Sequence, residues 1–397
     1  MRSTLRAAVL ALAIVVAHAG DEDLASMPKG VRTGARLYQE HCGSCHALWG
    51  EGSGTGLDLS LAPAPTGASL CRTIWRHTPL LAPTRGSGDE LSLADMEALY
   101  AFLYYVAIVD EPGDAAAGRK AIEDKGCLSC HSVAGRGGTV GPDLARWAAF
   151  GHPVVWAQMM WNHAPKMAER AKELDRKWPR LEGRDMVDII AYVRSTATEL
   201  EAAALSPGDP GAGRKVFEGK GCAGCHRADA AGKAVGPDLA RPSPEVRTVS
   251  QLAGEMWNHA PEMLQEMTAR GIPYPMLSPQ EMADLTAYLF TLRYFDPPGN
   301  AERGRLVFER KHCVLCHEAS DGSPARAPAL RAGAVSPMDL ARELWNHGRA
   351  MMDRMEGAKV PWPPLEQAEV IDLLEYLSSP RVASQSPGPG GKEPSSP

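Results

Sequence analysis

The sequence is poor in aromatic residues and has no excess of positive charge. Aromatic side chains make up 6% of its 397 residues, which is few for protein cores of this size, so another group is expected to fill part of the interior. Lysine and arginine number 42 against 48 aspartates and glutamates, which gives a formal net charge of -6. Because nucleic-acid-binding proteins present basic surfaces, nucleic acid is not an expected partner.

Long apolar runs are also missing, apart from one at the N-terminus. Arg2 and Arg6 precede an apolar run over residues 7–17, and Ala17-His18-Ala19 has the small-x-small pattern of a signal-peptidase site. The run is too short to cross a hydrocarbon layer of about 30 Å. Residues 1–19 are therefore predicted to be a signal peptide, and the exported chain is predicted to be soluble, without a membrane span. Loss of the two arginines would change the net charge from -6 to -8.

Cysteine is present in a pattern that differs from a disulfide framework. Eight of the nine cysteines form four CxxC pairs, and a histidine directly follows each pair. In this motif two thiols one helical turn apart bind the two vinyl groups of one haem, and the histidine becomes the fifth ligand of the iron. Four covalently bound haem c groups are therefore predicted. The predicted attachment cysteines are Cys42, Cys45, Cys127, Cys130, Cys222, Cys225, Cys313 and Cys316, and the predicted proximal histidines are His46, His131, His226 and His317.

The four motifs lie in four similar repeats, spaced 85 to 95 residues apart. Each repeat opens with a glycine and a short helical pattern before its first cysteine. A Gly-Pro-Asp-Leu turn or a variant of it follows the motif, then a helix expected to end in Trp-Asn-His or Trp-Arg-His, and then a closing amphipathic helix. Proline- and glycine-containing breaks separate the repeats. The predicted domains are 30–111, 113–206, 208–297 and 299–382, followed by a tail over 383–397 that is predicted to be disordered.

Each repeat resembles a class I (mitochondrial-type) cytochrome c domain in its CxxCH motif, its proline turn and its order of helices. The resemblance implies an all-α fold of four tandem domains, each wrapped around one haem. It also implies that the proximal histidine donates a hydrogen bond to the carbonyl oxygen of Pro142, Pro237 or Pro328. In the first repeat Leu57 stands at this position, and its carbonyl group can serve in the same way.

The sixth iron ligand has two candidates in most repeats. In many class I cytochromes a methionine ligand follows the end of the distal helix by about four residues, and this resemblance favours Met167, Met263 and Met351. The first repeat carries Leu81 at that position, so its candidate is His77. The alternative is histidine in every repeat, because His163, His259 and His347 share the position of His77.

Two other features are expected to be structural. The tryptophans Trp75, Trp161, Trp257 and Trp345 are expected to pack on the haem edge. The odd cysteine, Cys71, aligns with Ala157, Ala253 and Ala341. It is expected to be an inert, buried thiol.

These features predict an electron carrier that serves redox protein partners, with no catalytic residues of its own. One alternative is a haem enzyme, such as a peroxidase or a sulfur-compound oxidase, in which haem 1 is the reactive site. A third interpretation is an electron-transfer subunit of a larger oxidoreductase. The enzyme interpretation needs an open or labile sixth position, for which only the first repeat is a candidate.

Overall fold

The computed structural model describes residues 29–50, 52, 54–81, 90–147, 153–196, 206–228, 235–240, 246–318, 327 and 335–379. The predicted signal peptide, the predicted tail and Pro328 lie outside the described residues. Helices dominate the described part, in which the only strands are the short pair β1 (Ser132–Val133) and β2 (Arg136–Gly137). The prediction of an all-α fold is confirmed. None of the described helices combines the length and the apolar character needed to cross a membrane.

The chain divides into two compact units, which are described separately. Unit 1 contains Gly43–Ala64 and Tyr104–Tyr294 and therefore the second and third repeats. Unit 2 contains the described residues of Leu24–Cys42, Pro65–Leu103 and Phe295–Pro397, and therefore most of the first repeat and the fourth.

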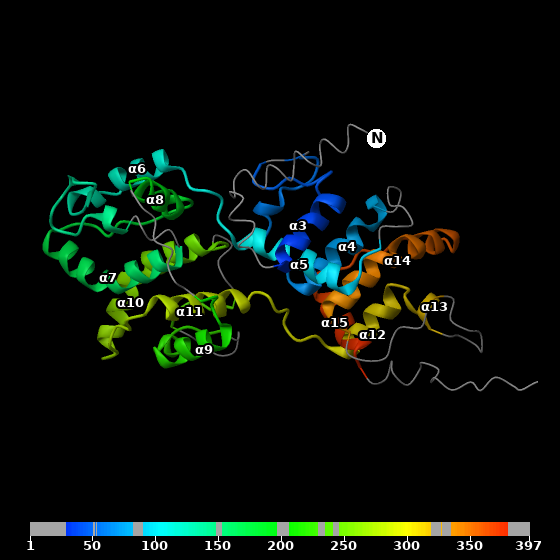
Figure 1. Ribbon diagram of the computed structural model, residues 1–397. Coiled ribbons are helices and arrows are strands. Elements are labelled where there is room, and N and C mark those ends of the chain that lie inside the picture. The colour runs from blue at the N-terminus through cyan, green and yellow to red at the C-terminus, as the bar shows by residue number, and fades with distance from the viewer. Residues whose placement is uncertain are drawn as a thin grey trace, which may run out of the picture. The chain divides into compact units, whose positions relative to one another are not determined.

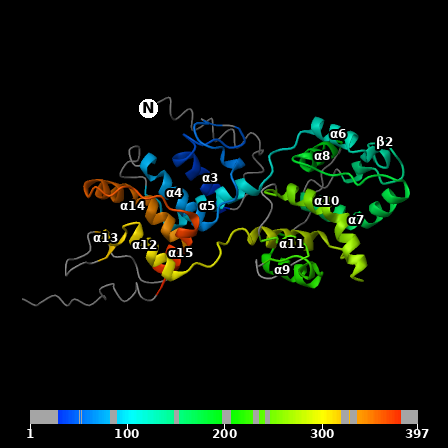
Figure 2. The same ribbon diagram turned by 180° about the vertical axis from the view of Figure 1, so that it is seen from behind.

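In each repeat the opening helix packs against the closing helix (Figures 1 and 2). The pairs are α6 (Ala115–Asp124) with α8 (Asp185–Arg194), α9 (Pro210–Gly219) with α11 (Pro279–Thr291), and α12 (Ala301–Arg310) with α15 (Gln367–Leu377). The glycine that opens each repeat lies where the helices meet. A Cβ atom on Gly213 would be 2.0 Å from the carbonyl oxygen of Asp284, and one on Gly304 would be 2.0 Å from that of Asp372. Only glycine permits this close approach.

The first repeat follows the same rule. Its opening helix is α3 (Lys29–His41), and its closing helix is α5 (Leu93–Ile108), which belongs to unit 2 as far as Leu103. A Cβ atom on Gly34 would be 2.0 Å from the carbonyl oxygen of Ala98. The ring centroids of Tyr38 and Phe102 are 5.5 Å apart across the same contact.

Buried aspartates on three closing helices join the two ends of their repeats. Each accepts a hydrogen bond from the backbone N–H of the residue that caps the opening helix. The pairs are Asp188 with Asp114 at 2.8 Å, Asp284 with Asp209 at 2.9 Å, and Asp372 with Asn300 at 2.8 Å. These aspartates are not among the residues predicted from the sequence, although their identical position in three repeats is a signal that self-comparison can detect.

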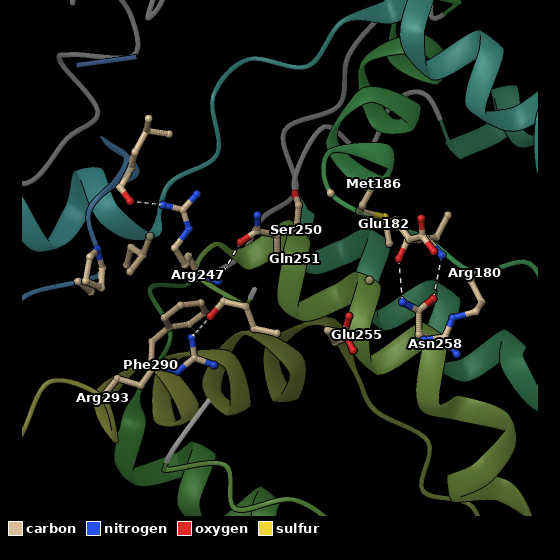
Figure 3. Close-up of a pocket in the computed structure, with 18 residues that line it drawn as sticks. Arg180, Glu182, Met186, Arg247, Ser250, Gln251, Glu255, Asn258, Phe290 and Arg293 are labelled. Carbon is tan, nitrogen blue, oxygen red and sulfur yellow. Dashed lines mark hydrogen bonds between the residues drawn. The ribbon is translucent and has the colours of Figure 1, made fainter. Parts of the chain in front are cut away.

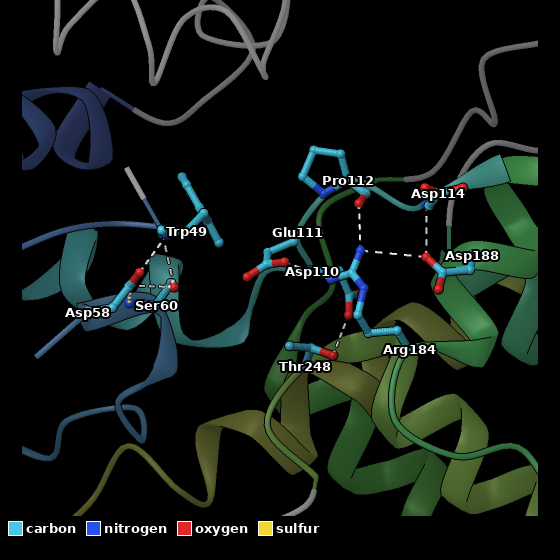
Figure 4. Close-up of polar contacts among 11 residues, drawn as sticks. Trp49, Asp58, Ser60, Asp110, Glu111, Pro112, Asp114, Arg184, Asp188 and Thr248 are labelled. Atoms are coloured by element: carbon cyan, nitrogen blue, oxygen red, sulfur yellow. Dashed lines mark hydrogen bonds and ion pairs between the residues drawn. The ribbon is translucent and has the colours of Figure 1, made fainter. Parts of the chain in front are cut away.

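The proline-glycine break before the second repeat is held by charged and polar contacts within unit 1 (Figure 4). Arg184 donates to Glu111 at 2.8 Å and to the carbonyl oxygen of Pro112 at 2.6 Å. Asp110 accepts a hydrogen bond from the hydroxyl of Thr248. It also accepts one from the amide of Ser250. The break is therefore fixed both to α8 and to the start of α10 (Val249–Ala269), the long helix of the third repeat.

The long helices of different repeats pair with each other inside each unit. Helix α7 (Pro153–Glu173) packs against α10 (Val249–Ala269) in unit 1, and α4 (Gly67–Leu81) packs against α14 (Pro337–Gly357) in unit 2. Cys71 is fully buried on α4, with its Sγ 3.1 Å from the carbonyl oxygen of Pro337. Burial raises the pKa of the Cys71 thiol far above its usual range, and the nearby Asp296 raises it further. This environment agrees with the expected inert thiol.

The asparagine of the Trp-Asn-His element joins neighbouring repeats. Asn162 donates to the carbonyl oxygen of Leu277 at 2.8 Å and accepts from its amide at 2.9 Å. Asn258 makes the reciprocal pair with Leu181, at 2.7 and 2.8 Å. In unit 2, Asn346 pairs in the same way with Leu91. The second repeat is thus paired with the third, and the first with the fourth.

Three of the tryptophans of this element, Trp75, Trp161 and Trp257, also contact the neighbouring repeat. Each of these three indoles stacks on an aromatic ring of that repeat, with centroid distances of 4.7 Å for Trp161 on Tyr274, 4.2 Å for Trp257 on Trp178 and 3.9 Å for Trp75 on Trp362. Each indole N–H donates to a carbonyl oxygen there, at 2.7 Å for Pro275, 2.7 Å for Pro179 and 2.6 Å for Pro363. A buried indole N–H needs such an acceptor. The packing of the tryptophans on the haem edge stays a prediction.

Prolines inside three of the long helices explain why these aromatic residues are needed. Pro165, Pro261 and Pro79 lack the N–H that would bond the carbonyl oxygen four residues earlier, which belongs to Trp161, Trp257 or Trp75. The neighbouring repeat supplies the missing donor. Tyr274 donates to Trp161 at 3.1 Å, Trp178 to Trp257 at 3.0 Å, and Trp362 to Trp75 at 3.1 Å. The helices can therefore continue through their prolines.

We expect Tyr274→Phe to lower the free energy of unfolding by about 1–3 kcal/mol, because the buried carbonyl group of Trp161 loses its donor. Burial raises the pKa of Tyr274 far above its usual range, so its hydroxyl stays protonated and able to donate. In a Pro165→Ala background the new helical amide can donate instead, and the loss should fall below about 1 kcal/mol. Denaturant unfolding of the four proteins measures this coupling. Equal losses in both backgrounds would contradict the proposed role of the hydroxyl.

Candidate haem-binding sites

In the second, third and fourth repeats the CxxCH segment is a tight turn that follows a residue in the left-handed conformation, which in the fourth repeat is His312 with a φ of 65°. Gly126, with a φ of 73°, precedes the short helix Cys127–Ser129, and Gly221, with a φ of 85°, precedes Cys222–Gly224. Glycine adopts this conformation without strain. The amide of His131 then bonds the carbonyl oxygen of Cys127 at 2.9 Å. The two thiols and the histidine are thereby held on one turn of chain.

All nine cysteines are free of disulfide bonds. Burial raises the pKa values of Cys127 and Cys222, and it raises the pKa of Cys313 to about 11. The first cysteine of each of these motifs therefore lies in apolar surroundings and is a protonated thiol at neutral pH. Such surroundings suit a large apolar macrocycle.

The proximal histidines are oriented by the turn that follows the motif. The Nδ1 atom lies 2.9 Å from the carbonyl oxygen of Pro142 for His131, and 3.2 Å from that of Pro237 for His226. In the first repeat the corresponding distance from His46 to Leu57 is 2.7 Å, so the contact forms without a proline. Because Nδ1–H donates to the carbonyl oxygen, Nε2 is the nitrogen that can bind a metal.

The glycine of the turn lies against the imidazole ring. A Cβ atom on Gly141 would be 2.4 Å from the Cε1 atom of His131, and one on Gly236 would be 2.6 Å from that of His226. The amide of Gly141 bonds the carbonyl oxygen of Cys130 at 2.8 Å. In the fourth repeat Ala327 stands at this position and makes the same amide bond to Cys316, at 3.0 Å.

The helices that carry the distal candidates do not end at the Trp-Asn-His element, as the sequence had suggested. Helices α7, α10 and α14 continue to Glu173, Ala269 and Gly357. His163 and Met167 therefore lie one turn apart on a single helix, about 6 Å along its axis. Met167 and Met263 pack against the hydrophobic core of unit 1, and Met351 is half-buried.

Three of the four candidate distal histidines share one orientation. His77, His259 and His347 use Nδ1 to bond the carbonyl oxygen four residues earlier, at 2.8, 2.9 and 3.3 Å. His163 is half-buried, and its ring centroid lies 6.4 Å from that of the proximal His131. Burial lowers the pKa of His163, and the nearby His131 and Lys166 lower it further, so this imidazole is neutral at neutral pH.

A separate cleft of about 1110 Å³ lies within unit 1 (Figure 3). Hydrogen bonds of Asn258 with Leu181 border it, as do those of Arg293 with Val246 and of Arg247 with Leu61. Of the described CxxCH residues and distal candidates, none lines this cleft. It is therefore distinct from the candidate haem sites.

The turn glycine can be tested within the third repeat. In Gly236→Ala the added methyl group must displace His226, and overpacking of this kind costs about 1–3 kcal/mol of unfolding free energy. Gly224→Ala is the matched control, because this exposed glycine has open space around its missing Cβ atom and its change should cost less than about 0.5 kcal/mol. Denaturant unfolding of the haem-loaded variants compares them. Equal stability would show that the turn does not press on the ring.

Comparisons with known protein families match three segments of the chain. Residues 115–197 and 211–293 each match the family model described as Cytochrome c, and residues 29–103 match the one described as Cytochrome C oxidase, cbb3-type, subunit III. The comparisons with curated proteins and with solved structures found no match. The matched segments coincide with the first three repeats and their CxxCH turns. The chain is therefore a c-type cytochrome built from several cytochrome c domains.

Proposed function

We propose that this cytochrome is an exported electron carrier that binds four haem c groups and serves redox protein partners. The observation that carries the proposal is the recurrence of one binding frame in all four repeats. The fourth repeat, which no family model covers, has the same opening glycine contact at Gly304, the same buried Asp372 and the same amide bond from Ala327 to Cys316. The fourth repeat thus has the same contacts as the second and third repeats, which a family model matches.

The chain's own residues hold and orient each group. The eight motif cysteines attach the haems, and His46, His131, His226 and His317 are the proximal ligands. The turn carbonyl groups of Leu57, Pro142 and Pro237 fix the imidazole rings. A bound haem supplies a one-electron iron couple at each site.

The carrier is preferred to a haem enzyme because the first repeat resembles the others on the distal side. Leu81 cannot bind iron, but His77 is oriented by Thr73 as His259 is by Glu255. The first repeat therefore offers a distal imidazole, whereas the enzyme interpretation needs an open position. The acidic composition of the chain suits docking on basic patches of redox partners.

The haem count and the cleavage site can be measured together by intact-mass analysis. The exported protein, made with full cytochrome c maturation, should start at Gly20 and carry four haems. The double change Cys313→Ala and Cys316→Ala should remove one haem and leave three, because the other motifs lie in separate repeats. Cys71→Ala is the matched control and should keep all four, since its thiol is outside the motifs. Fewer than four haems in the unaltered protein would refute the proposal.

A further inference from the structure

Two imidazole rings approach each other in the second repeat. His131 belongs to the CxxCH turn and directs its Nδ1 to Pro142, so its Nε2 is the ligand nitrogen. His163 comes from α7, and the two ring centroids are 6.4 Å apart with an angle of 55° between the planes.

This separation matches two imidazoles that bind one metal ion from opposite sides. A bond between a metal and an imidazole nitrogen is about 2 Å long, so the centroids of two rings placed opposite each other on one ion are roughly 6 Å apart. Two rings in direct stacking contact, such as those of Trp75 and Trp362, have centroids 3.9 Å apart. The histidine rings are therefore separated by about the space that an iron ion and its bonds require.

We propose that His163, and not Met167, is the sixth ligand of the haem iron in the second repeat, and that His77, His259 and His347 have the same role in the others. This assignment rests on the proposed haem loading. It makes the four sites bis-histidine sites within cytochrome c domains.

The continuous distal helix removes the main argument for methionine. In class I cytochromes of this register the distal helix ends first, and the methionine reaches the iron from the loop about four residues later. In α7 the helix continues to Glu173, and Met167 packs on the core of unit 1 one turn beyond His163. A single iron atom opposite His131 cannot be bound by both side chains, and the ring of His163 lies at the separation that such an atom requires. Under this assignment Met167 is an apolar core residue beside the ligand His163.

In the other repeats the histidine at this helix position is held by its Nδ1. Nδ1 of His77 is engaged with the carbonyl oxygen of Thr73, and Nδ1 of His259 and His347 with the carbonyl and carboxylate oxygens of Glu255 and Glu343, which leaves Nε2 as the ligand nitrogen in each case. The proximal histidines use Nδ1 in the same way, on the turn carbonyl groups. The first repeat needs no exception under this assignment, because a histidine is present there and a methionine is not.

Spectroscopy of the oxidised, haem-loaded protein tests the assignment without any substitution. All four haems should be low-spin and should lack the charge-transfer band of a methionine–iron bond. Near-infrared magnetic circular dichroism distinguishes the two ligand sets. A methionine–iron band that disappears in Met167→Leu would overturn the assignment for the second repeat, and a band that disappears in Met263→Leu or Met351→Leu would overturn it for the third or fourth.

Variants of the second repeat give an independent readout. His163→Ala should convert one of the four haems to a high-spin form that binds carbon monoxide, whereas the control Met167→Leu should leave spin state and reduction potentials unchanged. His163→Met should instead raise the potential of one haem, because a methionine ligand favours ferrous iron relative to histidine. This variant decides the matter if the alanine variant loses its haem. The reverse pattern, with a high-spin haem in Met167→Leu and none in His163→Ala, would overturn the proposal.

The haem count separates this proposal from the proposed function. Four haems by mass together with methionine–iron bands would refute only the ligand assignment. Fewer than four haems would refute the proposed function itself, and the assignment would then be judged on the second repeat alone.

Discussion

The paired architecture depends on carbonyl groups that prolines leave without a helical donor. A proline four residues after Trp75, Trp161 or Trp257 removes the amide that would bond the tryptophan's carbonyl oxygen. A buried carbonyl group without a donor is costly, and the neighbouring repeat supplies that donor from a tyrosine or a tryptophan. One missing N–H thus gives each of the first three repeats an unpaired carbonyl group, and the neighbouring repeat supplies its donor.

The same short element connects this interface to the haem site. Trp161, Asn162 and His163 are consecutive, and successive residues of a helix point about 100° apart. The first two bond the third repeat, through Pro275 and Leu277, while the third approaches the proximal His131 of its own repeat. The interface between repeats therefore fixes the rotation of the helix that carries His163. A change at the interface is expected to reach the candidate haem site through this one helix.

Much of the chemistry could be predicted from the sequence, because it is carried by local patterns. CxxCH, the turn that follows it and the opening glycine are short motifs whose repetition reveals them, and the structure shows the turn contact even where Leu57 replaces proline. The course of the distal helix could not be predicted in this way. Pro165 signals a helix end by every local rule. The residue that compensates for it, Tyr274, lies 113 positions from its acceptor in Trp161 and has no local signature.

The aromatic ring on which each of these tryptophans stacks could not be predicted either, because it is also distant in the sequence. A tryptophan beside a haem-binding motif is reasonably expected to lie on the haem, and only the tertiary contacts show the stacking on Trp178, Tyr274 or Trp362. The buried aspartates Asp188, Asp284 and Asp372 are a different case. Their recurrence was present in the sequence, and an acidic residue at one fixed position on three closing helices indicated a polar contact.

The order of pairing along the chain has a consequence for folding. The second and third repeats are neighbours in sequence, and the bond from Trp161 to Pro275 spans 114 residues, whereas the bond from Trp75 to Pro363 spans 288. Each doubling of a closed loop costs only about 0.6 kcal/mol, so the longer closure is thermodynamically mild. In time, however, the difference is large for a chain that is synthesised from its N-terminus. Trp75 and its carbonyl group, which has no helical donor, stay exposed until the second, third and fourth repeats have been synthesised.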